Sequence, residues 1–169
     1  MSAFAICRTA VLIVCMAGGC SRDGSAGPPD IVLGRDVCGE CGMVIGEDRF
    51  SAAMLVERGG HRESVLFDDI GCLLDYRNES EHADAIREVR SFVRDYARGR
   101  WIAGGEAWYL FADRGKLATP MGTGMAAFAT EEGARRAQRE YGGRIMRLAE
   151  LAEARKKWLE VLYGTRENG

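Results

Sequence analysis

Residues 64–76 read SVLFDDIGCLLDY, and this stretch places the end of a β-strand directly before the start of an α-helix. β-Branched and aromatic residues are typical of its strand-like first part. Asp68 and Asp69 then supply an N-cap and an acidic first turn, and the apolar residues that follow at helical spacing share one face. The stretch therefore predicts a strand that passes straight into an amphipathic helix.

A hairpin is expected immediately before this helix. Residues 51–56 (SAAMLV) have the content of a strand, residues 58–61 (RGGH) form a turn, and residues 64–67 return as the second strand. The charged segment 79–98 is predicted to form a second helix of this first unit, with its charges on a solvated face. The first unit is expected to span residues 37–100.

The same order of elements repeats in the second half of the chain, over residues 101–169. Thr130 is expected to cap a helix that ends near Tyr141, and residues 149–162 are expected to form a C-terminal amphipathic helix. The fold class is therefore predicted to be α+β, with two small degenerate ββαβ units packed together and a helix at the C-terminus. The strands of the second unit are expected at residues 107–111, 125–128 and 144–146.

The N-terminal residues indicate export. Residues 1–19 carry one charge, Arg8, and an apolar run shorter than the roughly 20 residues of a membrane-spanning helix, which is typical of a signal peptide. Small residues before Cys20 resemble a bacterial lipobox, so Cys20 is expected to be a lipidated N-terminus on the periplasmic side of a membrane. Ser21 stands where an Asp would favour retention in the inner membrane, so the outer membrane is the more favoured location. Residues 20–36 are expected to form a flexible tether.

Cysteine count and charge narrow the classes of function. The chain has six cysteines, and removal of the signal and lipidation of Cys20 leave Cys38, Cys41 and Cys72. An odd number of thiols in an oxidising compartment leaves at least one of them unpaired. With 23 basic and 25 acidic residues, the chain has no positive excess to attract nucleic acid. No motif places a general base beside a nucleophile, so the sequence predicts that the protein is not an enzyme.

The most informative motif is Cys38-Gly39-Glu40-Cys41-Gly42-Met43, which sets two thiols and a thioether within six residues. Thiolate and thioether sulfur are soft ligands and favour Cu(I) over Zn(II). Gly42 allows the chain to turn, which returns the thioether of Met43 toward Cys41. The motif also has structural alternatives, because the two cysteines can pair in a disulfide and a methionine is commonly a core residue.

Three further residues bear on a metal site. Met121 lies between Pro120 and Gly122 in a Gly-rich loop without helical or strand periodicity, so its side chain is poorly placed to join a core. His61 lies in the turn of the first hairpin, where an exposed histidine is commoner than a ligand. Cys72 lies on the apolar face of its helix and is expected to be a buried, inert thiol.

Five features in this order make the chain resemble the NosL family, accessory lipoproteins of nitrous oxide reductase biogenesis: a lipoprotein signal, CxxCGM, FDDIGCLLDY, WIAGGEAWY and TPMGTGMAAF. The resemblance extends from about residue 37 to residue 147. It implies a periplasmic copper chaperone that binds one Cu(I) and delivers it, together with a membrane transporter complex, toward the copper–sulfide centre of the reductase. It also implies two small ββαβ units, with the CGM motif at residues 41–43 and the PMG motif at residues 120–122.

We therefore expect a membrane-anchored copper-binding and transfer protein that holds Cu(I) between its two units. Cys41, Met43 and Met121 are the expected ligands, with Cys38 and His61 as weaker candidates. Nitrous oxide reductase and its membrane copper-transport complex are the expected partners. Two alternatives stay open: a structural zinc site made by the three cysteines with or without the histidine, and a CxxC thiol–disulfide protein. The glycine after the motif argues against the second, because it does not favour the helix start that lowers a thiol pKa.

Overall fold

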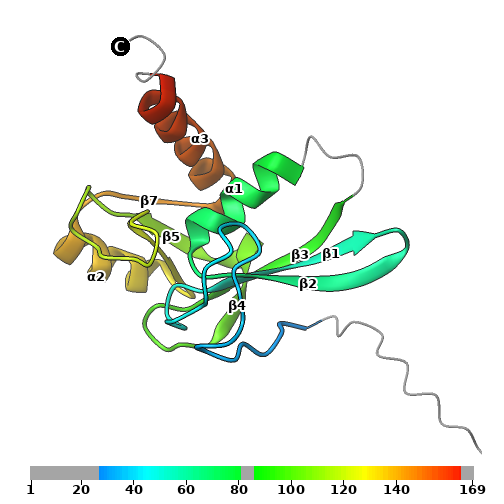
Figure 1. Ribbon diagram of the computed structural model, residues 1–169. Helices are drawn as coiled ribbons and strands as arrows, with labels where there is room; N and C mark the ends of the chain where they lie inside the picture. Colours follow the sequence, from blue (N-terminus) through cyan, green and yellow to red (C-terminus); the bar gives the residue numbers. More distant parts are fainter. Residues whose placement is uncertain (1–26, 81–85, 165–169) are drawn as a thin grey trace, which may run out of the picture.

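The computed structural model describes residues 27–80 and 86–164. In Figure 1, α1 lies at the centre of the molecule, α2 lies at the left-hand edge, and α3 extends upward beyond α1. The first unit contains β1 (Ala52–Arg58), β2 (His61–Phe67), α1 (Ile70–Ser80), β3 (Arg87–Arg94) and β4 (Trp101–Ala103). The second contains β5 (Trp108–Phe111), β6 (Met125–Phe128), α2 (Glu131–Tyr141), β7 (Arg144–Met146) and α3 (Leu148–Gly164).

The strands form two small antiparallel sheets. The strand order is β2-β1-β3-β4 in the first sheet and β6-β5-β7 in the second. The order strand, strand, helix, strand occurs in each unit, and Thr130 caps α2 by accepting a hydrogen bond from the N–H of Gly133. The predicted α+β class, with two small sheets and a C-terminal helix, is confirmed.

The prediction of a helix over residues 79–98 is wrong. α1 continues to Ser80, and β3 lies in the middle of the first sheet, between β1 and β4. Most of the charged residues of β3 stay at least partly exposed, while its residues 91–93 are buried. Arg77 of α1 forms two hydrogen bonds of 2.7 Å with the carboxylate of Glu88 in β3. Pairing with β1, which is far away in the sequence, therefore decides the conformation of a segment whose charges suggested a surface helix.

β4 pairs with the first sheet, although it lies in the range 101–169 expected for the second unit. Arg94 of β3 is opposite Trp101 of β4, and its guanidinium carbon lies 4.0 Å from the centre of the Trp101 ring. The chain then crosses to the second sheet through a short 3-10 turn at Gly104–Glu106. The two sheets are therefore joined by a compact connection.

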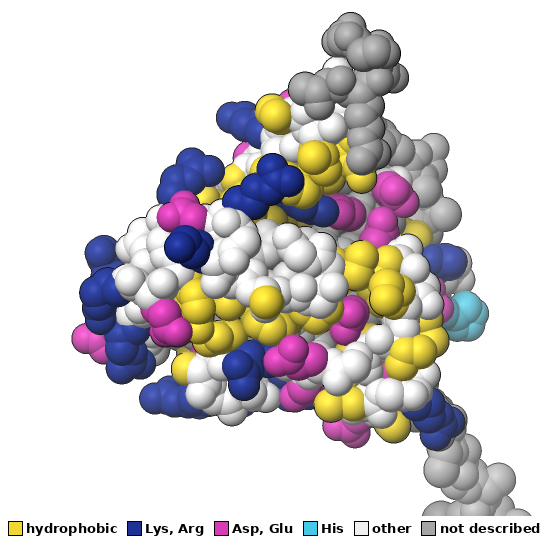
Figure 2. Space-filling view, turned by 60° about the vertical axis from the view of Figure 1, so that its left-hand side comes forward, with side chains coloured by type: hydrophobic (Ala, Val, Ile, Leu, Met, Phe, Trp, Pro, Cys, Tyr) yellow, Lys and Arg dark blue, Asp and Glu magenta, His cyan; other side chains and the backbone are white. Residues whose placement is uncertain are grey.

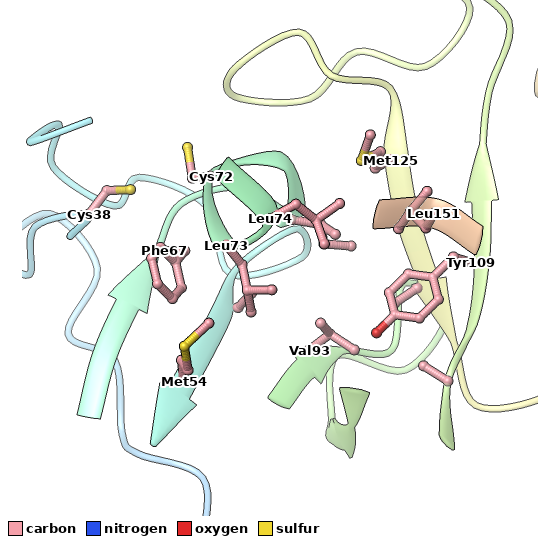
Figure 3. Close-up of a cluster of buried hydrophobic side chains, with 14 of the residues drawn as sticks. Cys38, Met54, Phe67, Cys72, Leu73, Leu74, Val93, Tyr109, Met125 and Leu151 are labelled. Atoms are coloured by element: carbon pink, nitrogen blue, oxygen red, sulfur yellow. The ribbon is translucent and has the colours of Figure 1, made fainter. Parts of the chain in front are cut away.

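The largest cluster of buried hydrophobic residues contains side chains from both sheets. Met54 of β1 and Tyr109 of β5 are both buried in it, and Leu73 and Leu74 of α1 lie between them in Figure 3. The hydroxyl of Tyr109 donates a hydrogen bond of 2.7 Å to the carbonyl of Gly104, so this buried polar group is satisfied. Because side chains pack closely against α1 on two sides, the residues of its first turn are held in a fixed position.

A partly buried ion pair attaches α3 to α1. Nε of Arg155 lies 2.9 Å from Oδ1 of Asp75, and Nη2 of Arg155 lies 2.7 Å from Oδ2. Arg155 is buried, and its guanidinium carbon lies 4.6 Å from the centre of the Trp158 ring. Two bonds in a fork geometry fix direction as well as distance, so α1 is held by α3 on one side and by β3 on the other.

The surface carries both signs of charge. On the face shown in Figure 2, basic and acidic side chains are interspersed, with a band of hydrophobic side chains between them. Within the described ranges, no helix combines the length and the apolar character that crossing a bilayer requires. The expected signal peptide and the expected lipidation site, Cys20, lie outside the described residues.

Candidate metal site

The CxxCGM motif folds into a tight hairpin loop. The N–H of Cys38 donates to the carbonyl of Met43 at 2.8 Å, and the N–H of Gly42 donates back to the carbonyl of Cys38 at 3.0 Å. Gly42 has a φ of 72°, in the region that favours glycine, so a side chain at this position would strain the turn. The loop turns Cys41 back toward Cys38.

The hairpin loop is attached to the end of β2. The N–H of Gly39 donates to the carbonyl of Leu66 at 2.8 Å. A Cβ atom on Gly39 would lie 2.3 Å from Cγ1 of Val65, so only glycine permits this close approach. Since β2 leads directly into α1, the contact places the two cysteines of the motif beside the start of that helix.

Cys72, in the first turn of α1, completes a cluster of three free thiols. The sulfur atoms of Cys38, Cys41 and Cys72 all lie within 4.8 Å of one another. Figure 3 shows Cys38 and Cys72 at the edge of the core, with the sulfur of Cys72 directed away from the leucines of α1. A metal in the middle of three sulfurs, with bonds of about 2.3 Å as in zinc sites, requires sulfur–sulfur distances of about 4 Å. The cluster therefore has the dimensions of a three-thiolate metal site.

The sequence assigned Cys72 a place among the apolar residues of its helix. The structure buries it as expected, at 4% exposure, and Cys38 is 2% exposed, while Cys41 is only partly buried. That Cys72 faces the other two thiols was expected only under the alternative of a three-cysteine zinc site, and not for the copper site. The sequence did contain one signal for this contact. The strand that ends at Phe67 passes almost directly into the helix that carries Cys72, so any loop attached to the end of that strand lies close to Cys72.

The three thiols differ in how readily they lose a proton. A hydrogen bond from the Cys72 thiol, helped by the backbone N–H groups of Cys41, Asp68 and Glu40, lowers the pKa of Cys38 to about 5 against the opposing effect of burial. Burial raises the pKa of Cys41. The hydrogen bond to Cys38, together with burial, raises the pKa of Cys72 strongly. The cluster thus carries one negative charge easily, and a bound cation would displace the remaining protons.

Carboxylates add negative charge around the cluster. Burial, with Glu79, Asp75 and the Cys38 thiolate, raises the pKa of Glu40 to about 7. Burial also raises the pKa of Asp68, and Oδ1 of Asp68 has no hydrogen-bond partner among the described residues. This acidic environment favours a bound cation over a free thiolate.

The two candidate thioethers lie in exposed loops, one continuous with the CxxC loop and the other attached to the residue before α1. Met43 directly follows the CxxC loop and is 55% exposed, and Met121 is 39% exposed. The Met121 loop turns through a hydrogen bond of 2.9 Å from the N–H of Gly122 to the carbonyl of Thr119. The N–H of Met121 donates to the carboxylate of Asp69, immediately before α1, so this loop of the second unit reaches the helix end that carries Cys72.

His61 lies at the other end of the first hairpin. It is the first residue of β2, paired with Arg58, and it is exposed. Leu66, whose carbonyl holds the CxxC loop, is five residues further along the strand, which is about 17 Å at the usual rise of a β-strand. The structure thus brings Cys38 and Cys41 together with Cys72, and does not bring His61 to them.

The chain is similar to known proteins in both sequence and fold. A crystal structure of the copper chaperone NosL from Shewanella denitrificans matches with a TM-score of 0.57 and 16% sequence identity, covering 73% of this chain and 94% of that chain. This likeness shows a shared fold. No curated protein matches the sequence significantly. The sequence model of the NosL family matches residues 31–155, most of the chain, and the protein therefore belongs to the NosL family.

Proposed function

We propose that this protein is a Cu(I)-binding and transfer protein, and not an enzyme. The observation that carries the proposal is the cluster of Cys38, Cys41 and Cys72, three free thiols with sulfur atoms within 4.8 Å of one another. Membership of the NosL family and the fold shared with a protein described as a copper chaperone support it.

The ligands favour Cu(I) because they are soft. Three thiols and two nearby thioethers offer only sulfur, and sulfur selects Cu(I) over harder divalent ions. We propose that the buried thiols retain the ion, while the exposed thioethers of Met43 and Met121 act as weaker donors that exchange with an acceptor. Cys41 is the thiol nearest to solvent, so it is the sulfur from which copper leaves. Cys72 is added to the ligands expected from the sequence.

The cellular setting is part of the proposal. Cys20 is the lipid anchor, and the protein acts on the periplasmic side of a bacterial membrane, more favourably the outer one. The acceptors are nitrous oxide reductase and its membrane copper-transport complex, as the family resemblance implies. Replacement of Cys20 by Ser should move the protein from the membrane fraction to the soluble periplasm without changing Cu(I) affinity. Recovery of the wild-type protein in the soluble fraction alone would contradict the anchor.

Anaerobic titration tests the proposed metal. The reduced chain, without its signal segment, is titrated with Cu(I) against a chromophoric Cu(I) chelator, and the amount bound is read from the competition. We expect one Cu(I) per chain and an affinity orders of magnitude above that for Zn(II), because thioether sulfur adds little to the binding of a borderline ion.

The same thiol cluster also suits zinc, which prefers four ligands in a closed site. Purification from mixed metals separates the two possibilities. Retention of zinc as tightly as copper, unchanged when Met43 and Met121 are both replaced by Leu, would favour a structural zinc site over copper transfer.

A further inference from the structure

Asp69 is a buried carboxylate that joins the two units at the start of α1. Its side chain has no solvent exposure. Oδ1 accepts hydrogen bonds from the N–H of Gly71 at 2.7 Å and from the hydroxyl of Thr123 at 2.5 Å, and Oδ2 accepts one from the N–H of Met121 at 3.2 Å. The first bond caps the helix that Asp69 precedes. The other two reach residues 54 and 52 positions away, in the loop of the second unit.

The loop is seated closely against the helix. A Cβ atom on Gly71 would lie 2.4 Å from Cγ2 of Thr123, so a side chain at this position would push the loop away. Thr123 is buried. The hydroxyl of Thr119 accepts hydrogen bonds from the N–H groups of Thr123 at 3.0 Å and Gly124 at 3.3 Å, which orders the loop internally. The Met121 loop is therefore ordered by its own hydrogen bonds and packs closely against the start of α1.

The same helix end carries the thiol cluster. Asp69 directly precedes α1, and Cys72 lies in its first turn. Gly71, the residue before Cys72, lies against Thr123 of the loop. The backbone of Met121 is bonded to Asp69, and a methionine side chain is long and flexible. Through Asp69, the backbone of Met121 in the second unit is thus held at the helix end that carries Cys72 of the first.

The geometry points to Asp69 as a positioning residue of the metal site: it holds the Met121 loop on α1 so that the thioether of Met121 stays beside the thiol cluster. This inference rests on the proposed function, because it gives Met121 a part in Cu(I) binding. Asn in place of Asp69 keeps a side-chain oxygen that can cap α1, so the three thiols stay in place while the attachment of the Met121 loop is weakened. The affinity for Cu(I) should therefore fall by about tenfold, at the lower end of the effect of residues that orient metal ligands.

A double-mutant cycle tests whether Asp69 acts through Met121. The full chain, reduced and anaerobic, is titrated with Cu(I) alone against a chromophoric chelator as wild type, Asp69→Asn, Met121→Leu and the double variant. We expect Asp69→Asn to weaken binding about tenfold in the wild type and less than about twofold in the Met121→Leu background. An equal loss in both backgrounds would overturn the inference, because Asp69 would then act on something other than the thioether.

Thr123 offers a matched pair if Asp69→Asn does not fold. Thr123→Val keeps the shape and removes the hydroxyl, whereas Thr123→Ser keeps the hydroxyl that donates to Asp69. The first variant should weaken Cu(I) binding in the same direction as Asp69→Asn, and the second should not. Equal affinities for the two variants would contradict the inference.

Amide hydrogen exchange gives a measurement that does not depend on copper. The N–H of Met121 should exchange faster in Asp69→Asn and Thr123→Val than in the wild type and Thr123→Ser, because its attachment is lost or loosened. Unchanged protection would show that Asp69 does not hold the loop. If the wild type binds Cu(I) and Met121→Leu binds it equally well, the positioning role fails while copper binding stands. A wild-type chain that binds no Cu(I) would overturn both.

Discussion

The three thiols of the first unit are clustered and two of them are buried, whereas the two candidate thioethers are exposed. Cys38 and Cys72 are 2% and 4% exposed, but Met43 and Met121 are 55% and 39% exposed. The two kinds of sulfur also differ in charge, since the cluster carries a thiolate at Cys38 and a thioether is always neutral. The buried region is therefore suited to retaining a cation, and the exposed region is suited to exchanging one with a partner.

The two regions are also held in different ways. The CxxC loop is fixed by backbone hydrogen bonds and by the close approach of Gly39 to Val65, so its geometry depends on the first unit alone. The Met121 loop is held on α1 mainly by the side chain of Asp69. Retention should thus survive changes in the second unit, and exchange should not.

The largest effect is expected from Cys38→Ser. Cys38 carries the most easily formed thiolate, because the hydrogen bond from the Cys72 thiol and the backbone N–H groups directed at its sulfur lower its pKa. Its loss should reduce Cu(I) affinity by about 1,000-fold, or about 4 kcal/mol, while circular dichroism stays unchanged. Chelator competition measures the loss, with Met54→Leu as the control for a buried sulfur outside the site. A loss of tenfold or less would remove the distinction between strong and weak sulfur donors.

A smaller but diagnostic effect is expected from pH. Cys38 is already ionised at pH 7, whereas Cys41 and Cys72 have raised pKa values and still hold protons. If all three bind as thiolates, Cu(I) binding at pH 7 releases about two protons, so affinity should rise about 100-fold for each unit of pH. Raising the pH tightens binding because it removes the protons that compete with copper.

Affinities measured between about pH 6 and pH 8 give the slope, after correction for protonation of the chelator. Cys72→Ser should lower the slope to about one proton, because one protonated thiol is lost from the site. Glu40→Gln is the control, since burial and neighbouring charge raise the pKa of Glu40 to about 7 and it titrates in the same range. A wild-type slope of one would mean that only two of the three sulfurs bind as thiolates.

The parts of the fold that the sequence predicted correctly are those determined by neighbouring residues. The strands at 125–128 and 144–146 have the predicted bounds, and the helix capped by Thr130 ends at Tyr141 as predicted, because caps, glycines and alternation are encoded in adjacent residues. The missed strand β3 depends on pairing with β1, about 35 residues earlier. Its charged residues resemble a surface helix until that pairing is known.

The same distinction applies to the site. The CxxCGM motif is local, so its metal-binding character can be read directly from six residues. Cys72 and Asp69 gain their roles from tertiary contacts, one with the CxxC loop and the other with the Met121 loop. In the sequence they have ordinary explanations, a core cysteine and a helix cap, and both explanations are also true of the structure. When a local role such as a core position or a helix cap already explains a residue, the sequence does not indicate that the residue has a second role in a tertiary contact.

Met43→Leu and Met121→Leu should each weaken Cu(I) binding by about tenfold, or about 1.4 kcal/mol. Leucine is close to methionine in volume and lacks the sulfur donor, so the fold should be unaffected. Met125→Leu is the matched control, because Met125 is buried in β6 and belongs to the core. Its Cu(I) affinity should equal that of the wild type. If Met121→Leu also equals the wild type, the site belongs to the first unit alone.

The smallest effect is expected from His61→Ala, which tests whether His61 binds Cu(I) in addition to the sulfur ligands. His61 is exposed at the far end of the first hairpin, about 17 Å along β2 from the strand end that holds the CxxC loop. Its imidazole is also a harder ligand than sulfur and adds little to a Cu(I) site made of thiolates. The change in affinity should stay below about twofold, within the scatter of mutations distant from the site. A loss of tenfold, measured with the same chelator and with Arg62→Ala as a neighbouring control, would mean that the hairpin folds over the thiols when copper binds.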